Sequence, residues 1–113
     1  PLQLGNPDPT RDYTYVEDIV KGYVALAERG KNGEIYHFCS GKERSVKDIV
    51  ETIMELSGGP SKVSWSPGLR KVDILRSVGS YEKARKDLGW EPMTTFEDGI
   101  RKTIEWYRSA TER

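Results

Sequence analysis

The chain has 113 residues, of which 35% are hydrophobic, so it suffices for one domain with a small core. Its 18 Lys and Arg residues balance 18 Asp and Glu residues, which argues against a nucleic acid or a membrane recognised through overall charge. No apolar run approaches the roughly 18 residues of a spanning helix. We therefore expect a soluble chain with neither a nucleic-acid nor a membrane partner.

The N-terminal end shows two short strand patterns, over Leu2–Leu4 and Arg11–Tyr15. Between them, Pro7 and Pro9 stand among turn-forming residues, and two prolines this close exclude a helix. The pattern predicts a hairpin-like start to the chain.

A helix and a strand are predicted next. Apolar residues recur at helical spacing over Glu17–Arg29, with Asp18 near the start, where an acid complements the helix dipole, and Gly30 after the end. The run Glu34–Cys39 is rich in aromatic and β-branched residues, which favours a strand.

The second half of the chain adds three helical patterns and one short strand. Ser45, with Asp48 three residues later, is the predicted cap of a helix that ends at Gly58. The other elements are a strand over Lys62–Ser66, a helix over Ser80–Leu88 closed by Gly89, and a helix opened by Thr95 and Asp98 that runs along Phe96, Ile100, Ile104 and Tyr107. The arginine-bearing segment Leu69–Gly79 fits a helical or an extended conformation. The pattern as a whole indicates an α/β chain of about four helices with short strands.

Residues of special chemistry are few. Cys39 is the only cysteine and lies in an apolar run, so we interpret it as a buried thiol of a reducing, cytoplasmic protein. His37 is the only histidine, and with no second histidine or cysteine at ligand spacing a metal site is not predicted.

Three arginines, Arg11, Arg70 and Arg76, lie close to glycines, prolines or turn residues. A guanidinium group offers two parallel N–H donors that match two phosphate oxygens, so three of them can build an anion clamp. The alternative is that they form ordinary surface ion pairs, which contribute little. The candidate partners for such pairs are Asp12, Asp73 and Asp87. Composition alone favours the ion pairs.

A set of motifs, read in order, resembles one enzyme superfamily. The motifs are Thr10-Arg11-Asp12-Tyr13, Tyr15-Val16, Asp18, the Glu34-Ile35-Tyr36-His37-Phe38 strand with Ser40-Gly41, Ser45-Val46, Lys83-Ala84-Arg85, and Leu88-Gly89-Trp90 with Pro92. Together they resemble the C-terminal part of the NAD-dependent sugar-nucleotide epimerases and 4,6-dehydratases of the extended short-chain dehydrogenase/reductase superfamily. The resemblance implies that residues 1–113 are a single substrate-binding region, a C-terminal fragment of a Rossmann-type protein whose N-terminal NAD-binding domain is absent from this chain.

The resemblance also implies a substrate site. Arg11 matches the arginine that contacts the nucleotide near its diphosphate in relatives, and Arg70 matches the second diphosphate ligand. Asp73 is implied as a ribose contact and Arg76 as a further substrate-binding candidate. Lys71–Val72 stand where relatives carry Pro-Gly, which changes the approach of this loop to the nucleotide. The implied ligand is a nucleoside-diphosphate sugar, and the choice between epimerase and dehydratase, the base and the sugar all stay open.

The chemistry of this superfamily needs two further motifs. A G-x-x-G-x-x-G turn binds NAD and a Y-x-x-x-K pair transfers protons, and the 113 residues contain neither. We therefore expect no catalytic residue, no cofactor-binding residue and no metal ligand in this chain, and NAD or NADP in the parent enzyme.

Two interpretations follow. The chain is either the substrate-binding portion of an epimerase or dehydratase, which the joint presence of Arg11, Arg70 and Asp73 favours, or a free-standing binding or assembly module without catalysis. Its start at Pro1, without an initiator methionine, favours a fragment. In the first case we expect the helix over Glu17–Arg29 to lie against the N-terminal Rossmann domain, and the isolated chain to form homo-oligomers.

Overall fold

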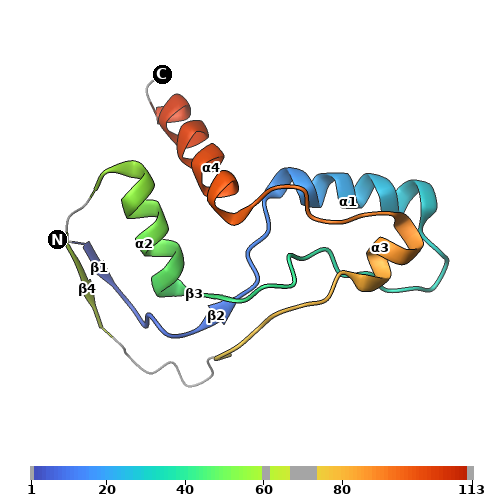
Figure 1. Cartoon of the computed structure of the whole chain (residues 1–113), viewed down its shortest axis with the longest axis horizontal. Coiled ribbons are helices and arrows are strands. Elements are labelled where there is room, and N and C mark those ends of the chain that lie inside the picture. The colour runs from blue at the N-terminus through green and yellow to red at the C-terminus, as the bar shows by residue number, and fades with distance from the viewer. Residues whose placement is uncertain (1, 60–61, 67–73, 112–113) are drawn as a thin grey trace.

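The computed structural model describes residues 2–59, 62–66 and 74–111. The elements in chain order are β1 (Leu2–Leu4), β2 (Thr10–Arg11), α1 (Val16–Arg29), β3 (Arg44–Ser45), α2 (Val46–Ser57), β4 (Val63–Trp65), α3 (Glu82–Leu88) and α4 (Phe96–Thr111) (Figure 1). The α/β class with four helices and short strands is thus confirmed.

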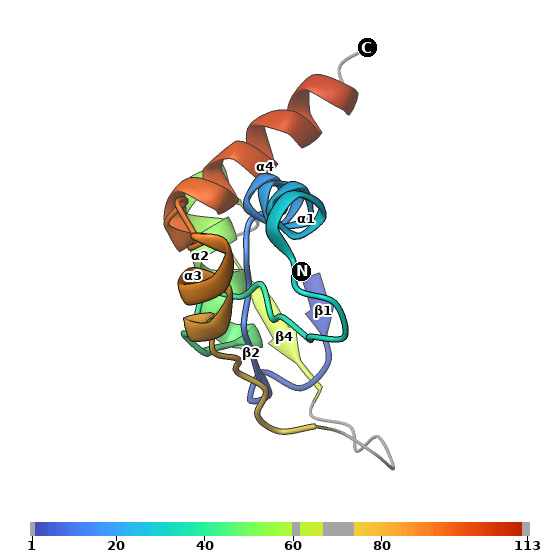
Figure 2. The same cartoon turned by 90° about the vertical axis from the view of Figure 1, so that its right-hand side faces the viewer.

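The elements form two groups (Figure 1). Helices α2 and α4 pack together near β1 and β4, and α1 packs against α3 at the other end. The short ladder of β2 and β3 lies between the two groups. Seen along α1, the N-terminal strand β1 runs beside β4 (Figure 2).

The core lies between α1 and α3. Its buried members are Ala25, Ala84, Leu88 and Trp90, and the rings of Tyr36, Phe38 and Tyr81 pack against them. The small Gly22 of α1 is part of this packing, since a Cβ placed there would stand 2.8 Å from the Phe38 ring.

The helical predictions are confirmed, with one shift. Ser45 and Asp48 form a reciprocal capping box, in which the Ser45 hydroxyl accepts the Asp48 amide at 3.0 Å and the Asp48 carboxylate accepts the Ser45 amide at 3.1 Å. Gly58 ends α2 in the left-handed conformation with φ 81°. Helix α3 begins at Glu82, two residues later than predicted, because the Ser80 hydroxyl accepts the Glu82 amide at 3.3 Å in a turn before the helix.

The hairpin prediction is wrong. β1 pairs in parallel with β4, Leu2 opposite Val63, and β2 pairs antiparallel with β3. The segment between β1 and β2 caps α2 instead, since the carbonyls of Pro7 and Pro9 accept the amides of Lys47 and Val46 at 3.1 and 3.0 Å. The two carbonyls therefore satisfy donors that a helix start leaves unpaired.

Two strand predictions fail in part or in full. The strand predicted over Arg11–Tyr15 is limited to Thr10–Arg11, because the Asp12 carboxylate turns to the backbone of the Ser40 loop. Glu34–Cys39 is no strand within the described residues, because it forms no ladder with another described segment. Its side chains still alternate as a strand's would, with Tyr36 and Phe38 against the core and His37 exposed.

The structure corrects one further expectation. Cys39 is half-buried, not buried, and its sulfur lies against Gly79. Partial burial and the neighbouring Asp12 carboxylate raise the pKa of its thiol. Among the described residues, no helix is long and apolar enough to cross a membrane.

Candidate functional site

Arg11 lies where β2 contacts residues 74–77. Its Nη1 donates to the carbonyl of Thr10 at 2.7 Å and to the carbonyl of Ile74 at 2.6 Å. Two backbone hydrogen bonds run beside it: the Thr10 amide donates to Leu75 at 2.8 Å, and the Ser77 amide donates to Thr10 at 3.2 Å. Residues 74–77 are therefore held along β2 by backbone and side chain together.

Arg76 projects from that held segment onto Glu43. Its Nε and Nη2 donate to the two carboxylate oxygens of Glu43 at 3.0 and 2.6 Å, a bidentate pair. The hydrogen bonds from Arg76 and from the Thr10 hydroxyl lower the pKa of Glu43, and the bond to Glu43 raises the pKa of Arg76. The ion-pair interpretation thus holds for Arg76, but its partner is a glutamate and none of the aspartates considered.

Of the four residues implied as substrate ligands, the structure describes two. Both contact the junction of β2 with residues 74–77, Arg11 through the Ile74 carbonyl and Arg76 through Glu43. Arg70 and Asp73 lie outside the described residues. Asp73 directly precedes Ile74 in the chain, so Arg11 holds the residue that follows the predicted ligands Arg70 and Asp73.

Asp12 organises the backbone around this junction. Its carboxylate accepts the amide and hydroxyl of Ser40 at 2.8 and 2.6 Å, the amide of Gly41 at 2.9 Å and the amide of Gly79 at 3.3 Å. Partial burial acts to raise the pKa of Asp12, but these hydrogen bonds to its charged form outweigh burial and hold the pKa below the usual value. Sequence reasoning treated Asp12 as a surface partner for arginine and missed this role.

Asp18 has a comparable role one turn into α1. It is 1% exposed, and its carboxylate accepts the amides of Met93 and Thr94 at 3.2 and 3.0 Å. Its backbone carbonyl accepts the indole N–H of Trp90 at 2.8 Å. The motif acid Asp18 therefore ties the start of α1 to the chain that leads into α4, which is a structural role.

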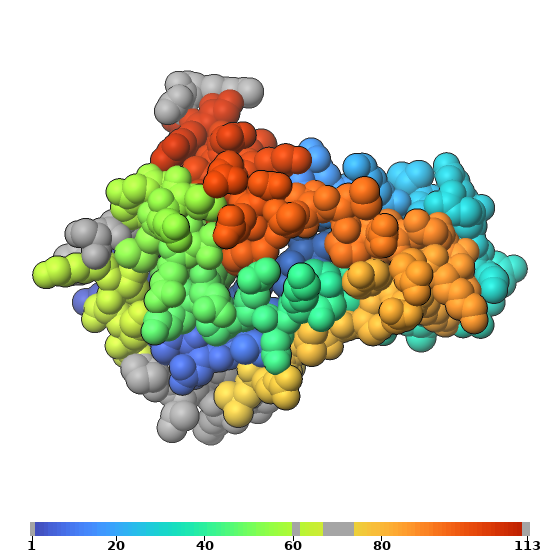
Figure 3. Space-filling view, in the orientation of Figure 1, coloured from blue at the N-terminus to red at the C-terminus, as the bar shows by residue number. Residues whose placement is uncertain are grey.

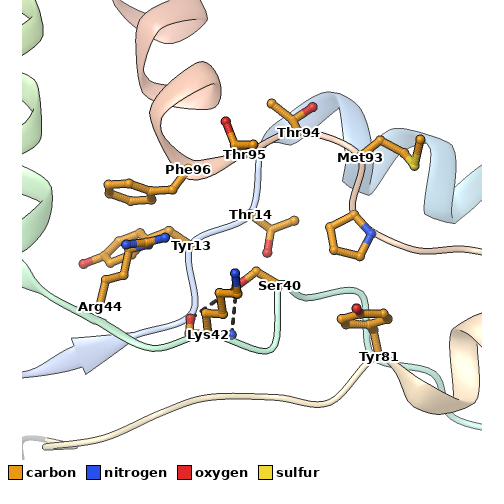
Figure 4. Close-up of a pocket in the computed structure, with 11 residues that line it drawn as sticks. Tyr13, Thr14, Ser40, Lys42, Arg44, Tyr81, Met93, Thr94, Thr95 and Phe96 are labelled. Atoms are coloured by element: carbon orange, nitrogen blue, oxygen red, sulfur yellow. Dashed lines mark hydrogen bonds between the residues drawn. The ribbon is translucent and has the colours of Figure 1, made fainter.

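A cavity of about 300 Å³ lies beside the Ser40 loop, where that loop faces the residues before α4 across a hollow of the surface (Figure 3). Tyr13, Arg44 and Phe96 line one side of the cavity and Tyr81 the opposite side (Figure 4). The Arg44 guanidinium stacks over the Phe96 ring, 4.1 Å from its centroid. With Lys42 also in the lining and no carboxylate among the described lining residues, the cavity presents two cationic side chains and no acidic one.

These features suit an anionic ligand better than a metal. The guanidinium groups of Arg11, Arg44 and Arg76 are donors, which bind phosphate or carboxylate oxygens. Within residues 2–59, 62–66 and 74–111, no group of His, Cys, Asp and Glu side chains is placed to hold a metal ion.

The chain is similar to known proteins over nearly all of its length. A family model described as GDP-mannose 4,6 dehydratase matches residues 1–103. A dTDP-glucose 4,6-dehydratase of Escherichia coli K12 is 36% identical over 96% of this chain, and the match covers 32% of that protein. The chain thus spans about a third of the length of the curated relatives it matches.

Two solved structures share the fold. The UDP-glucose 4-epimerase of Thermotoga maritima, solved with UDP-glucose, aligns with a TM-score of 0.89 at 31% identity over 97% of this chain and 35% of the epimerase. A dTDP-glucose 4,6-dehydratase of Bacillus anthracis, solved with NAD, aligns with a TM-score of 0.87 at 27% identity over 97% of this chain and 35% of the dehydratase. Since the family model covers most of its length, the chain belongs to the GDP-mannose 4,6 dehydratase family, within the NAD-dependent epimerases and 4,6-dehydratases of the extended short-chain dehydrogenase/reductase superfamily.

Proposed function

We propose that this chain is the nucleotide-sugar-binding portion of an NAD-dependent nucleotide-sugar epimerase or 4,6-dehydratase. The observation that carries the proposal is the position of Arg11, whose guanidinium lies against the Ile74 carbonyl, next in the chain to Asp73 and four residues from Arg70. A diphosphate bound at this junction would be within reach of Arg11 from β2 and of Arg76 from residues 74–77, which directly follow the proposed ligands Arg70 and Asp73 in the chain.

The proposed ligands are Arg11, Arg70, Asp73 and Arg76. Arg11 and Arg70 would share the diphosphate, Asp73 would accept a ribose hydroxyl, and Arg76 would add positive charge beside them. Arginine suits this role because its fork pairs with two phosphate oxygens at once.

The chemistry itself would lie outside this chain. The glycine-rich NAD turn and the Tyr–Lys pair belong, in this proposal, to the other two thirds of the parent, which would bind NAD or NADP and act as an isomerase or a lyase. The single, half-buried Cys39 fits a reducing, cytoplasmic location.

Titration calorimetry with uridine, guanosine and thymidine diphosphates tests the proposal. We expect weak binding that falls with ionic strength, because exposed arginine–phosphate pairs are screened by salt and the rest of the cleft is missing. The base that binds most tightly identifies the nucleotide class.

Two variants locate the site. Arg11→Lys keeps the charge but loses the fork, and Arg11→Ala loses both, so we expect weakening of about tenfold in the alanine variant and less in the lysine variant. Arg101→Ala is the matched control, since Arg101 pairs on α4 with Asp98 and not with the junction. Undetectable binding of all three diphosphates would favour the free-standing assembly module.

A further inference from the structure

We propose that Glu43 is a positioning residue of the nucleotide-sugar site, which orients Arg76 and fixes residues 74–77 against β2. This inference rests on the proposed function, because it assigns a role at the same site to a residue that no motif indicates.

One carboxylate makes three hydrogen bonds here. Oε2 of Glu43 accepts the Thr10 hydroxyl at 2.8 Å and Nε of Arg76 at 3.0 Å, and Oε1 accepts Nη2 of Arg76 at 2.6 Å. Both partners lie 33 positions away in the chain, in opposite directions. Glu43 therefore joins β2, the loop before β3 and the segment 74–77 at a single point.

The backbone hydrogen bonds of residues 74–77 lie beside the Glu43 carboxylate. Thr10, whose hydroxyl reaches Glu43, exchanges backbone hydrogen bonds with Leu75 and Ser77, and its neighbour Arg11 holds Ile74. Displacing the Glu43 carboxylate would thus loosen the side-chain part of the junction that holds residues 74–77 along β2.

Its bidentate geometry distinguishes this pair from the pair between Lys47 and Glu51 in α2. The Arg76 side chain is 72% exposed and that of Glu43 31%, but two hydrogen bonds of 3.0 and 2.6 Å join them, whereas Lys47 and Glu51 stand 3.8 Å apart. A loose pair of that kind contributes little, but a bidentate arginine pair fixes the plane of the guanidinium.

Fixing that plane leaves part of the guanidinium for a ligand. Of the five N–H donors of an arginine, the Glu43 carboxylate takes one on Nε and one on Nη2 of Arg76. The remaining donors, including both on Nη1, are then held in one orientation in which they can meet an anion.

A role through charge and a role through positioning predict opposite effects of removing the Glu43 carboxylate on diphosphate binding. If Glu43 acts only through its negative charge, its removal should strengthen the binding of a diphosphate, because like charges repel. If Glu43 positions Arg76 and residues 74–77, its removal should weaken binding although a negative charge is lost.

The experiment compares Glu43→Gln with Glu51→Gln, an equal change of charge on α2. We measure uridine, guanosine and thymidine diphosphate affinity by calorimetry, together with hydrogen exchange of the Thr10 and Ser77 amides. In Glu43→Gln we expect about tenfold weaker binding of the diphosphate and faster exchange of both amides. In Glu51→Gln we expect the affinity and the exchange rates to stay within about twofold of those of the unmodified chain. Thr10→Val, which removes one of the three hydrogen bonds without a change of charge, should weaken binding by about threefold.

The outcomes are distinguishable. Unchanged or tighter binding in Glu43→Gln, with normal binding by the unmodified chain, would overturn the positioning role and leave the proposed function intact. An unmodified chain that binds none of the three diphosphates would overturn the proposed function, and the role of Glu43 with it.

Discussion

Asp12 and Ser40 are joined by two hydrogen bonds to one carboxylate oxygen, from the Ser40 amide at 2.8 Å and from its hydroxyl at 2.6 Å. Asp12→Asn keeps the size of the side chain but replaces one acceptor oxygen with a donor, which then faces the amides of Gly41 and Gly79. We expect a loss of about 1–3 kcal/mol in the free energy of unfolding. Urea denaturation measures it, with Asp98→Asn on the exposed side of α4 as control.

The same carboxylate predicts a dependence of stability on pH. The pKa of Asp12 in the folded chain lies below its usual value of about 3.9 in an unfolded chain. Its stabilising contribution is therefore fully present above pH 4 or so and is lost as the pH falls through the lower, folded-state pKa. Plotted against pH, the free energies of unfolding of the unmodified chain and of Asp12→Asn should converge in acid. A difference that stays constant down to pH 2 or so would contradict this.

Gly22 is predicted to resist substitution by alanine. In a helix, alanine is favoured over glycine by about 1 kcal/mol, but the added Cβ would stand 2.8 Å from the Phe38 ring, inside the core contact of α1. Overpacking of this kind costs about 1–3 kcal/mol, so we expect a net loss of stability in Gly22→Ala. Gly5→Ala is the control, because a Cβ there meets nothing within 4 Å. A higher melting temperature for Gly22→Ala than for the unmodified chain, measured by thermal denaturation, would show that the Phe38 ring can move.

The outer face of α1 should drive self-association. Val16, Val20, Tyr23 and Val24 lie on one face of the helix and are between 53% and 64% exposed, while Asp18, Gly22 and Ala25 on the opposite face are buried. An apolar stripe of this kind is a contact surface. Light scattering should show oligomers at high concentration, fewer in Val20→Lys and as many in Val78→Lys, whose residue is also exposed but lies outside α1. A monomer at every concentration would argue against this interface.

Local signals in the sequence were sufficient for the helices. The cap of α2 needs only Ser45 and Asp48, which stand three residues apart, and the end of the helix needs only Gly58. All of these residues are close together in the sequence, so the pattern alone predicts the helix. Strands differ, because their partners are set by the fold. The run Glu34–Cys39 has the residues of a strand and alternates like one, but no propensity tells whether another segment will lie alongside it.

The site was predictable only where a resemblance pointed to it. Arg11 and Arg76 both contact the junction of β2 with residues 74–77, but their roles as substrate ligands, like those of Arg70 and Asp73, stay predictions. The roles of Asp12 and Glu43 were not predicted, for a physical reason. The partners of Asp12, Ser40 and Gly79, lie 28 and 67 positions away in the chain. Both partners of Glu43, Thr10 and Arg76, lie 33 positions away. No spacing rule brings such pairs together before the chain has folded.

The hydrogen bond from Trp90 to Asp18 has a kinetic consequence. It spans 72 positions, and the bond from Thr94 to the same residue spans 76. Helices α1 and α3 can begin to form from local contacts, but the buried cluster of Ala25, Ala84, Leu88 and Trp90 assembles only once the ends of that long loop have met. We therefore expect closure of this loop to limit the rate of folding, and a cut in α2 would leave Ala25 on one piece and Ala84, Leu88 and Trp90 on the other.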